Sequence, residues 1–307
     1  MKIFITGGTG FVGSRLTSRL IQEGNEVTIL SRSGGGPARE PGGISYIQGD
    51  PTQKGPWQEA IGSHEVIINL AGASIFSRWT EERKRAILES RIHTTRNIVE
   101  GIPSRAEKPI AFLSTSAVGY YGFCGDEELV EDSPPGNDFL SRLAVEWEGE
   151  ALKAEEKEVR VVLMRFGIVL GEGGGALGQM IPLFKKYIGG PLGSGKQWFS
   201  WIHVQDLAGA IVFLMNHPEI SGPVNLCSPN PVRNRDLAEA LGKALRRPSF
   251  LTAPGFMLRW VLGEFGSVLL EGQRVIPRRL LDRGFVFQYP GIDQALQHII
   301  RQGNHQT

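Results

Sequence analysis

The stretch Gly-Gly-Thr-Gly-Phe-Val-Gly near the start of the chain has the glycine spacing of a phosphate-binding turn. It follows an apolar run at residues 2–6 and precedes a segment whose apolar residues recur at helical spacing. Glycines let the backbone approach a pyrophosphate, whose charge then lies at the amino end of the helix. The pattern predicts a dinucleotide site, the alternative being a tight turn without a ligand. The residues expected to contact the nucleotide are Gly7, Thr9, Gly10, Phe11, Val12 and Gly13.

The second apolar run ends at Leu30, and Ser31, Arg32 and Ser33 follow it. A carboxylate at this place typically binds the ribose 2′-hydroxyl of NAD. Arg32 instead presents a planar set of donors that suits a 2′-phosphate, to which the two serine hydroxyls can add. We therefore expect NADP(H) rather than NAD. The alternative is a solvated surface arginine.

A third apolar run ends in residues with small side chains, against which a cofactor could lie; the alternative is a packing turn. Arg91 falls on the apolar face of a helix expected at residues 80–102. A buried guanidinium needs an anion or an acceptor. A cofactor phosphate is one candidate, and Glu82, Glu89 or a strand-end carbonyl is the alternative. The residues at the end of this apolar run that are expected to contact the cofactor are Leu70, Ala71 and Gly72.

The segment from 193 to 207 joins a glycine turn to aromatic and ionisable side chains. His203 titrates in a range useful for proton transfer, although a structural histidine is the commoner case. Asp206 is expected to cap the helix that it opens. The six histidines show no ligand spacing, so we expect no metal site. The aromatic residues, which could stack on a sugar or a base or else pack in the core, are Trp198, Phe199 and Trp201.

The elements that must position these residues alternate between strands and helices. Most of the expected strands are continuously apolar, which is typical of a parallel sheet covered on both faces. We therefore predict an α/β fold with a Rossmann-type doubly wound parallel sheet over residues 1–250, including part of the substrate cleft. Residues 159–171 are expected to form one of its strands. A small, mainly helical C-terminal domain is expected over residues 251–303.

The composition excludes several classes of protein. The chain has 307 residues, of which 41% are hydrophobic and 21% charged, as in ordinary globular domains. A net charge of +1 gives no argument for nucleic acid or an anionic membrane. Two cysteines cannot build a disulfide framework. No signal peptide or membrane span is evident, so we expect a cytoplasmic protein.

These features together resemble the extended short-chain dehydrogenase/reductase superfamily, and within it an atypical family of NADP-binding, epimerase-like proteins. The matching stretches include GGTGFVGSRL, VTILSR, IINLAG, SRIHTTR and FGIVLGEGGGALG, and at the C-terminal end LLEGQRVIPRRLLDRGFVFQYP. The resemblance implies a Rossmann-type domain with NADP in its cleft and a substrate site beside the small C-terminal domain. By matching position it implies cofactor contacts from Ser31, Arg32, Leu70, Ala71, Arg91 and Val169.

The catalytic pair of the superfamily is absent. There a tyrosine is the acid/base, and a lysine four residues later lowers its pKa. None of the five tyrosines in this chain has a lysine at that spacing. The aligned helix offers Asp138 or Phe139 at the tyrosine position and Arg142 at the lysine position. Asp138 is also well placed to cap the helix.

The catalytic residues expected from the resemblance are hydroxyl groups near one strand end. Ser116 matches the superfamily serine that orients the substrate oxygen, and Ser114 matches it less well. Tyr120 and Tyr121 follow that strand end and are the best replacements for the acid/base. The alternative is that both aromatic rings pack the wall of the cleft.

The expected function is that of an NADP-dependent oxidoreductase or epimerase acting on a small or nucleotide-sugar-like substrate. The alternative is a non-catalytic NADP(H)-binding sensor or interaction protein, which accounts for the missing pair. The expected partner is a small-molecule substrate, with neither nucleic acid nor membrane involved. A homodimer is the oligomeric state that we consider.

Overall fold

The core of the protein is one twisted sheet between two layers of helices. The computed structural model describes residues 1–33, 39–40, 43–104 and 110–304. The strand order is β12-β8-β6-β5-β1-β2-β4-β3, in which all strands are parallel except β3, which pairs with β4 in the antiparallel sense. The strands are β1 (Lys2–Thr6), β2 (Glu26–Ser31), β3 (Arg39–Glu40), β4 (Ile44–Gln48), β5 (Val66–Asn69), β6 (Ala111–Ala117), β8 (Arg160–Phe166) and β12 (Gly222–Leu226).

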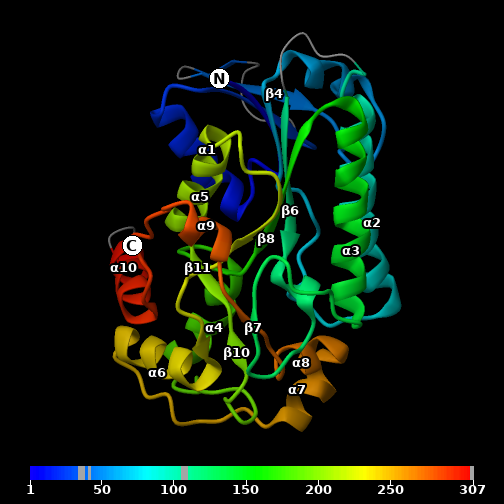
Figure 1. Cartoon of the computed structure of the whole chain (residues 1–307). Helices are drawn as coiled ribbons and strands as arrows, with labels where there is room; N and C mark the ends of the chain where they lie inside the picture. Colours follow the sequence, from blue (N-terminus) through cyan, green and yellow to red (C-terminus); the bar gives the residue numbers. More distant parts are fainter. Residues whose placement is uncertain (34–38, 41–42, 105–109, 305–307) are drawn as a thin grey trace.

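Helices cover both faces of this sheet (Figure 1). Alternate residues of a strand point to opposite faces, so Ile3 and Ile5 pack with Leu16 of α1 (Phe11–Gln22) and with α5 (Val204–Asn216). Phe4 points the other way, toward the layer that contains α2 (Glu81–Gly101) and α3 (Phe139–Leu152). Each such buried aliphatic or aromatic side chain contributes about 1.5–3 kcal/mol. The predicted Rossmann-type doubly wound fold is confirmed.

One predicted strand is in fact two. The run expected as a single strand breaks at Gly167 into β8 and β9 (Ile168–Leu170), and β9 leaves the main sheet to pair with β11 (Trp201–His203). A Cβ atom on Gly167 would lie 3.0 Å from the Ser200 carbonyl oxygen and 3.0 Å from the Cys227 Cβ. The chain therefore turns where no side chain fits, which the apolar pattern alone does not reveal.

Short elements outside the main sheet complete the molecule. Strand β7 (Glu128–Leu129) pairs with β14 (Arg274–Val275), and β10 (Trp198–Phe199) pairs with β13 (Val232–Arg233). The 3-10 helices are η1 (Pro56–Ser63), η2 (Val118–Tyr121) and η3 (Lys153–Lys157). The remaining helices are α4 (Gly175–Lys185), α6 (Asn234–Leu245), α7 (Gly255–Leu262), α8 (Glu264–Val268), α9 (Arg278–Asp282) and α10 (Ile292–Asn304).

The C-terminal region is helical, as expected, but discontinuous. Gly263 has a φ of +64°, a left-handed conformation that separates α7 from α8. Helix α7 buries none of its residues, and Trp260 is 81% exposed. Helix α10 packs against α4 and α6 through one apolar cluster. The division at residue 250 stays a prediction.

Candidate functional site

The glycine turn joins β1 to α1 in a shape that requires glycine. Gly7 has a φ of +74°, and a Cβ on it would lie 2.7 Å from the carbonyl carbon of Leu70. A Cβ on Gly13 would lie 2.1 Å from the Gly7 carbonyl oxygen. Gly10 stands at the N-cap of α1 without a side-chain cap, so the first backbone N–H groups of the helix have no side-chain acceptor there. This geometry fits a bound pyrophosphate.

The exposed side of the turn is a surface hollow of about 330 Å³. Thr9, Gly10 and Phe11 line it, and Glu172 and Gly173 close its other side. Val12 is half-buried and packs against the core below the turn. Among the residues of the turn predicted to bind the nucleotide, Thr9, Gly10 and Phe11 therefore line the hollow, whereas Val12 packs beneath it.

The end of β2 lies beside this turn, because β2 is the neighbour of β1 in the sheet. Ser31 is buried, and its hydroxyl lies 3.4 Å from that of Ser33. Arg32 is exposed and has no hydrogen bond or ion pair within the described part of the chain. A free guanidinium at this strand end suits an anionic ligand.

The end of β5 forms the opposite wall of the cleft. The Gly7 backbone touches Leu70, and Ala71 donates its backbone N–H to the Asn69 side chain at 3.2 Å. A Cβ on Gly72 would lie 3.2 Å from the central guanidinium carbon of Arg91. The β5 end therefore contacts both the glycine turn and the α2 arginine.

Arg91 is partly exposed and bonds to backbone carbonyls rather than to a carboxylate. Its Nη1 donates to the carbonyl oxygens of Ala73 at 3.1 Å and Ile87 at 2.9 Å. Its guanidinium lies 5.2 Å from the Trp147 ring centre. Burial lowers the pKa of Arg91 to about 10, so the group remains charged at neutral pH. The strand-end carbonyl considered as an alternative is one of its partners.

Val169 lies in β9, which is followed by a glycine loop. Val169 is half-buried, and its carbonyl oxygen would lie 2.7 Å from a Cβ on Gly175. A Cβ on Gly174 would lie 2.6 Å from the Phe11 ring. The loop after β9 is therefore packed on the first residue of α1. The cofactor contact predicted for Val169 stays a prediction.

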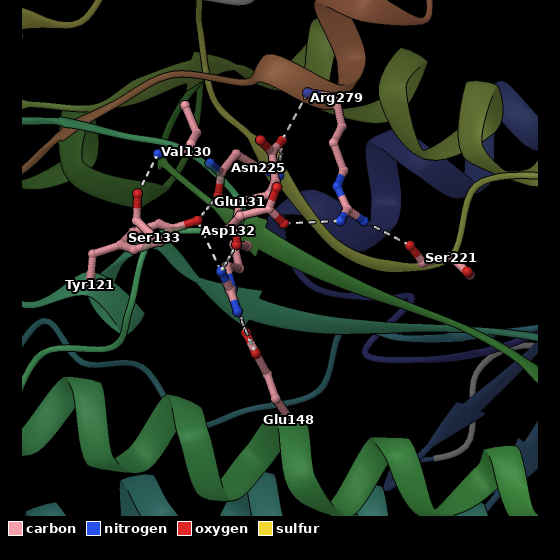
Figure 2. Close-up of polar contacts among 10 residues, drawn as sticks. Tyr121, Val130, Glu131, Asp132, Ser133, Glu148, Ser221, Asn225 and Arg279 are labelled. Atoms are coloured by element: carbon pink, nitrogen blue, oxygen red, sulfur yellow. Dashed lines mark hydrogen bonds and ion pairs between the residues drawn. The ribbon is translucent and has the colours of Figure 1, made fainter.

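The predicted catalytic serine is committed to a buried ion pair. Ser116 is 1% exposed, and its hydroxyl donates to Glu148 Oε1 at 2.6 Å. Glu148 in turn receives two bonds of 2.8 Å from Arg165 of β8. Figure 2 shows Glu148 rising from its helix toward this group. In this arrangement the Ser116 hydroxyl is turned away from solvent.

Tyr121 belongs to the same buried network. Its hydroxyl donates to Asn225 Oδ1 at 2.7 Å and accepts from Arg165 Nη1 at 2.9 Å. Asn225 also donates its backbone N–H to Glu131, whose carboxylate accepts from the Arg279 backbone as well (Figure 2). Burial raises the pKa of Tyr121 far above its ordinary value. A fully buried hydroxyl with two partners does not reach a substrate.

Tyr120 differs from Tyr121 because it is only half-buried. Its ring lies over the Arg165 guanidinium, with 3.5 Å between the guanidinium carbon and the ring centre. Tyr120 therefore borders the buried network and, unlike Tyr121, is partly exposed.

The positions aligned with the missing pair do not rebuild it. Asp138 accepts from the Ser141 backbone at 2.9 Å and so caps α3. Phe139 packs edge-on against Trp79 at 5.3 Å between ring centres. Arg142 is exposed and donates to the Asn137 carbonyl. The helix-cap interpretation of Asp138 is confirmed by this geometry.

The predicted cap of α5 was assigned to the wrong residue. His203 caps the helix, because its Nδ1 accepts from the Gln205 backbone at 3.0 Å. Asp206 is buried in the first turn and accepts the backbone N–H groups of Gln288 and Tyr289 at 2.7 and 2.9 Å. Its carboxylate thus holds the segment that leads into α10, a long-range partner with no local signal.

The aromatic residues of this segment separate into two roles. Trp201 is fully buried and donates to the Asn230 carbonyl at 3.1 Å. Trp198 is partly exposed between Arg233, at 3.8 Å from its ring, and Arg274, at 5.2 Å. The sequence did not predict the two arginines around Trp198 or the Arg165–Glu148 ion pair. An arginine inside the apolar strand at residues 160–166 was the available signal for the ion pair.

A match to known proteins extends over most of the chain. Residues 3–227 match the model of the NAD dependent epimerase/dehydratase family. The chain belongs to that family. Residues 253–299 match a second one, described as a domain of unknown function, DUF1731. Membership in the epimerase/dehydratase family confirms the resemblance seen in the sequence.

Full-length relatives of this epimerase/dehydratase chain include two curated proteins. The chloroplastic epimerase family protein SDR39U1 homolog of Arabidopsis thaliana is 42% identical, over 98% of this chain and 87% of that protein. Epimerase family protein YfhF of Bacillus subtilis is 41% identical, over 98% of each chain.

Two solved structures of similar proteins share the fold. Human epimerase family protein SDR39U1, solved with NADPH, is 35% identical with a TM-score of 0.84, over 98% of this chain and 99% of that one. The nucleoside-diphosphate sugar epimerase of Corynebacterium glutamicum is 31% identical with a TM-score of 0.78, over 98% of this chain and 58% of that one.

Two further features bear on the predicted ligands. Within the described ranges, no three or more His, Cys, Asp or Glu side chains gather as a metal-binding group. In the same ranges, no helix combines the length and apolar character needed to span a bilayer.

Proposed function

We propose that this member of the epimerase/dehydratase family binds NADP(H) in the cleft between the glycine turn and the end of β5. The observation that carries the proposal is the contact of the Gly7 turn with Leu70, together with Arg32, which forms no ion pair with the described residues. Gly7 and Gly13 leave no room for a Cβ, as a backbone that approaches a pyrophosphate requires. The NADPH of the human relative supports the same cofactor.

The proposed activity is that of an NADP-dependent oxidoreductase or epimerase on a small or nucleotide-sugar-like substrate. The cofactor would supply or accept the hydride. A side chain must then move the proton, and Tyr120 is the candidate because Tyr121 and Ser116 are buried in the Arg165 network. We propose a cytoplasmic location for this activity.

A second candidate function is a non-catalytic NADP(H)-binding sensor. The observation that favours it is the commitment of the Ser116 hydroxyl to Glu148, which leaves the usual substrate-orienting group occupied. The two functions are separated by incubating the purified protein with NADPH and carbonyl compounds, and with NADP and sugar nucleotides. Turnover supports the enzyme; tight NADPH binding without any turnover supports the sensor.

Changing Arg32 to alanine is expected to weaken NADPH binding by roughly 10- to 100-fold, because charge-assisted hydrogen bonds to a phosphate contribute about 1.5–3 kcal/mol. NADH binding should change far less, since NADH lacks the 2′-phosphate. Titration calorimetry with both nucleotides measures the difference. Arg283→Ala, at an exposed arginine of a surface ion pair, serves as the matched control. Equal weakening of NADPH and NADH would refute the 2′-phosphate contact.

Changing Tyr120 to phenylalanine is expected to lower kcat by roughly a hundredfold or more, the usual contribution of a positioned proton carrier. Tyr121→Phe is the matched control, because it removes a buried hydroxyl of the same network and should mainly lower the unfolding free energy, by about 1–3 kcal/mol. Steady-state kinetics on any substrate found above, with urea unfolding of both variants, tests this. Unchanged kcat in Tyr120→Phe would remove Tyr120 from the mechanism.

A further inference from the structure

A cavity lies where the carboxyl ends of α4 and α6 meet α10. Figure 1 shows these three helices at its lower left. Its volume is about 610 Å³, and α4, α6 and α10 share one apolar cluster that forms its base. None of its lining residues belongs to the predicted cofactor cleft. The cations that line this basic cavity are Lys185, Lys243, Arg246, Arg247 and Arg301.

The positive charge of the basic cavity is not balanced by protein carboxylates. No Asp or Glu lines it, and none of its five cations forms an ion pair with a described residue. Elsewhere, cations such as Lys84 and Arg96 do pair with glutamates. The ends of α4 and α6 carry about half a negative charge each, so roughly four positive charges remain in excess. Like charges held together in this way attract a multivalent anion.

Arg247, one of the cations of the basic cavity, is held in place by few contacts with the described residues. Its guanidinium is held over the Tyr187 ring, at 4.7 Å from the ring centre. Its Nη1 reaches only the Arg246 carbonyl, at 3.4 Å. Its Nε is buried and has no hydrogen-bond partner in the described structure. The Arg247 guanidinium therefore lines the cavity with donors that the described residues do not satisfy.

We propose that the basic cavity is a second ligand site, for a small anion that carries two or more phosphate groups. Guanidinium groups match phosphate oxygens through paired N–H donors, and the site offers three of them together with two lysines. A single phosphate would fill little of the volume and meet only part of the charge. Gln297 of α10 adds a neutral donor at the rim.

The test is calorimetric titration of the full chain with tripolyphosphate and, separately, with inorganic phosphate. We expect saturable single-site binding of tripolyphosphate that weakens at least about tenfold in Arg246→Glu/Arg301→Glu, because two attractive contacts become repulsive. Lys54→Glu/Arg283→Glu makes the same change in net charge away from the cavity and should bind as the unchanged protein does. The affinity for NADPH should be the same in the unchanged protein and in both double variants.

Three outcomes would overturn the proposal. These are no saturable binding of tripolyphosphate at millimolar concentration, an equal loss in the control variant, and phosphate binding as tight as tripolyphosphate binding. Arg246 and Arg301 are exposed, so the variants should fold, and their thermal unfolding is measured alongside. If the double reversal does unfold, Lys185→Gln/Lys243→Gln, which only removes charge, takes its place with the same expected direction.

Discussion

Arg165→Met is expected to lower the free energy of unfolding by about 3–5 kcal/mol, the usual cost of breaking a buried ion pair from one side. The Arg165 and Glu148 side chains are 3% and 7% exposed. Burial alone would lower the pKa of Arg165, yet its bonds to Glu148 raise that pKa above its ordinary value. The substitution leaves the Glu148 carboxylate in the interior with the Ser116 hydroxyl as its remaining hydrogen-bond donor.

Urea unfolding followed by circular dichroism measures this loss. Arg283→Met is the matched control, because it removes the same side chain from a pair that is half-exposed and 3.8 Å long. Exposed pairs contribute about 0–1 kcal/mol, so the control should unfold almost as the unchanged protein does. Arg165→Met with Glu148→Leu should recover much of the lost stability, since no charge is then left buried. If the free energy of unfolding of Arg165→Met lies within about 1 kcal/mol of that of the unchanged protein, the buried ion pair does not have the proposed role.

Features of the site that depend on residues close together in the chain could be predicted from the sequence. The glycine turn was predictable because the determinants are local: an apolar strand, glycines and a helix within residues 2–22. Arg91 was predictable in part, because its place on an apolar helical face called for an acceptor. Its partners, the carbonyls of Ala73 and Ile87, depend on how α2 meets the end of β5.

The surroundings of the predicted catalytic residues could not be read from the sequence, because their partners are distant in the chain. Ser116 and Tyr121 match expected positions, but Glu148 and Arg165 occupy their hydroxyls, and these come from α3 and β8. The sequence marks only that an arginine stands inside an apolar strand. The break at Gly167 and the role of Asp206 are likewise set by contacts with residues 200, 227, 288 and 289. Tertiary packing decides each of these features.

The stability of the protein is expected to fall by about 2 kcal/mol between pH 7 and pH 5 because of His203. This residue is 1% exposed, and burial followed by the neighbouring His298 lowers its pKa to about 3. The unfolded chain binds the proton near pH 6.5, whereas the folded chain resists it. The contribution of His203 is therefore complete above pH 6.5 and is lost progressively as the pH falls toward 3.

The surroundings of His203 give no group that would stabilise its protonated form. His298 of α10 lies 3.2 Å from its Nε2 and has a pKa that burial also lowers. Tyr289 stacks on the imidazole at 4.1 Å. The nearby Asp206 carboxylate is occupied by two backbone donors, and burial raises its pKa. Because burial raises the pKa of Asp206, proton uptake by this carboxylate adds stability as the pH falls through that raised pKa, which opposes the loss from His203 in the acidic range.

His203→Asn isolates this effect. Asparagine is among the best N-cap residues, so it can accept the Gln205 N–H in place of the imidazole without titrating. The variant should lose most of the stability difference between pH 7 and pH 5, whereas His217→Asn, at an exposed histidine beside Glu219, should keep it. Urea unfolding at the two pH values gives the comparison. If His203→Asn keeps the full pH dependence, the proton is taken up elsewhere, and the histidine pair between α5 and α10 does not control acid stability.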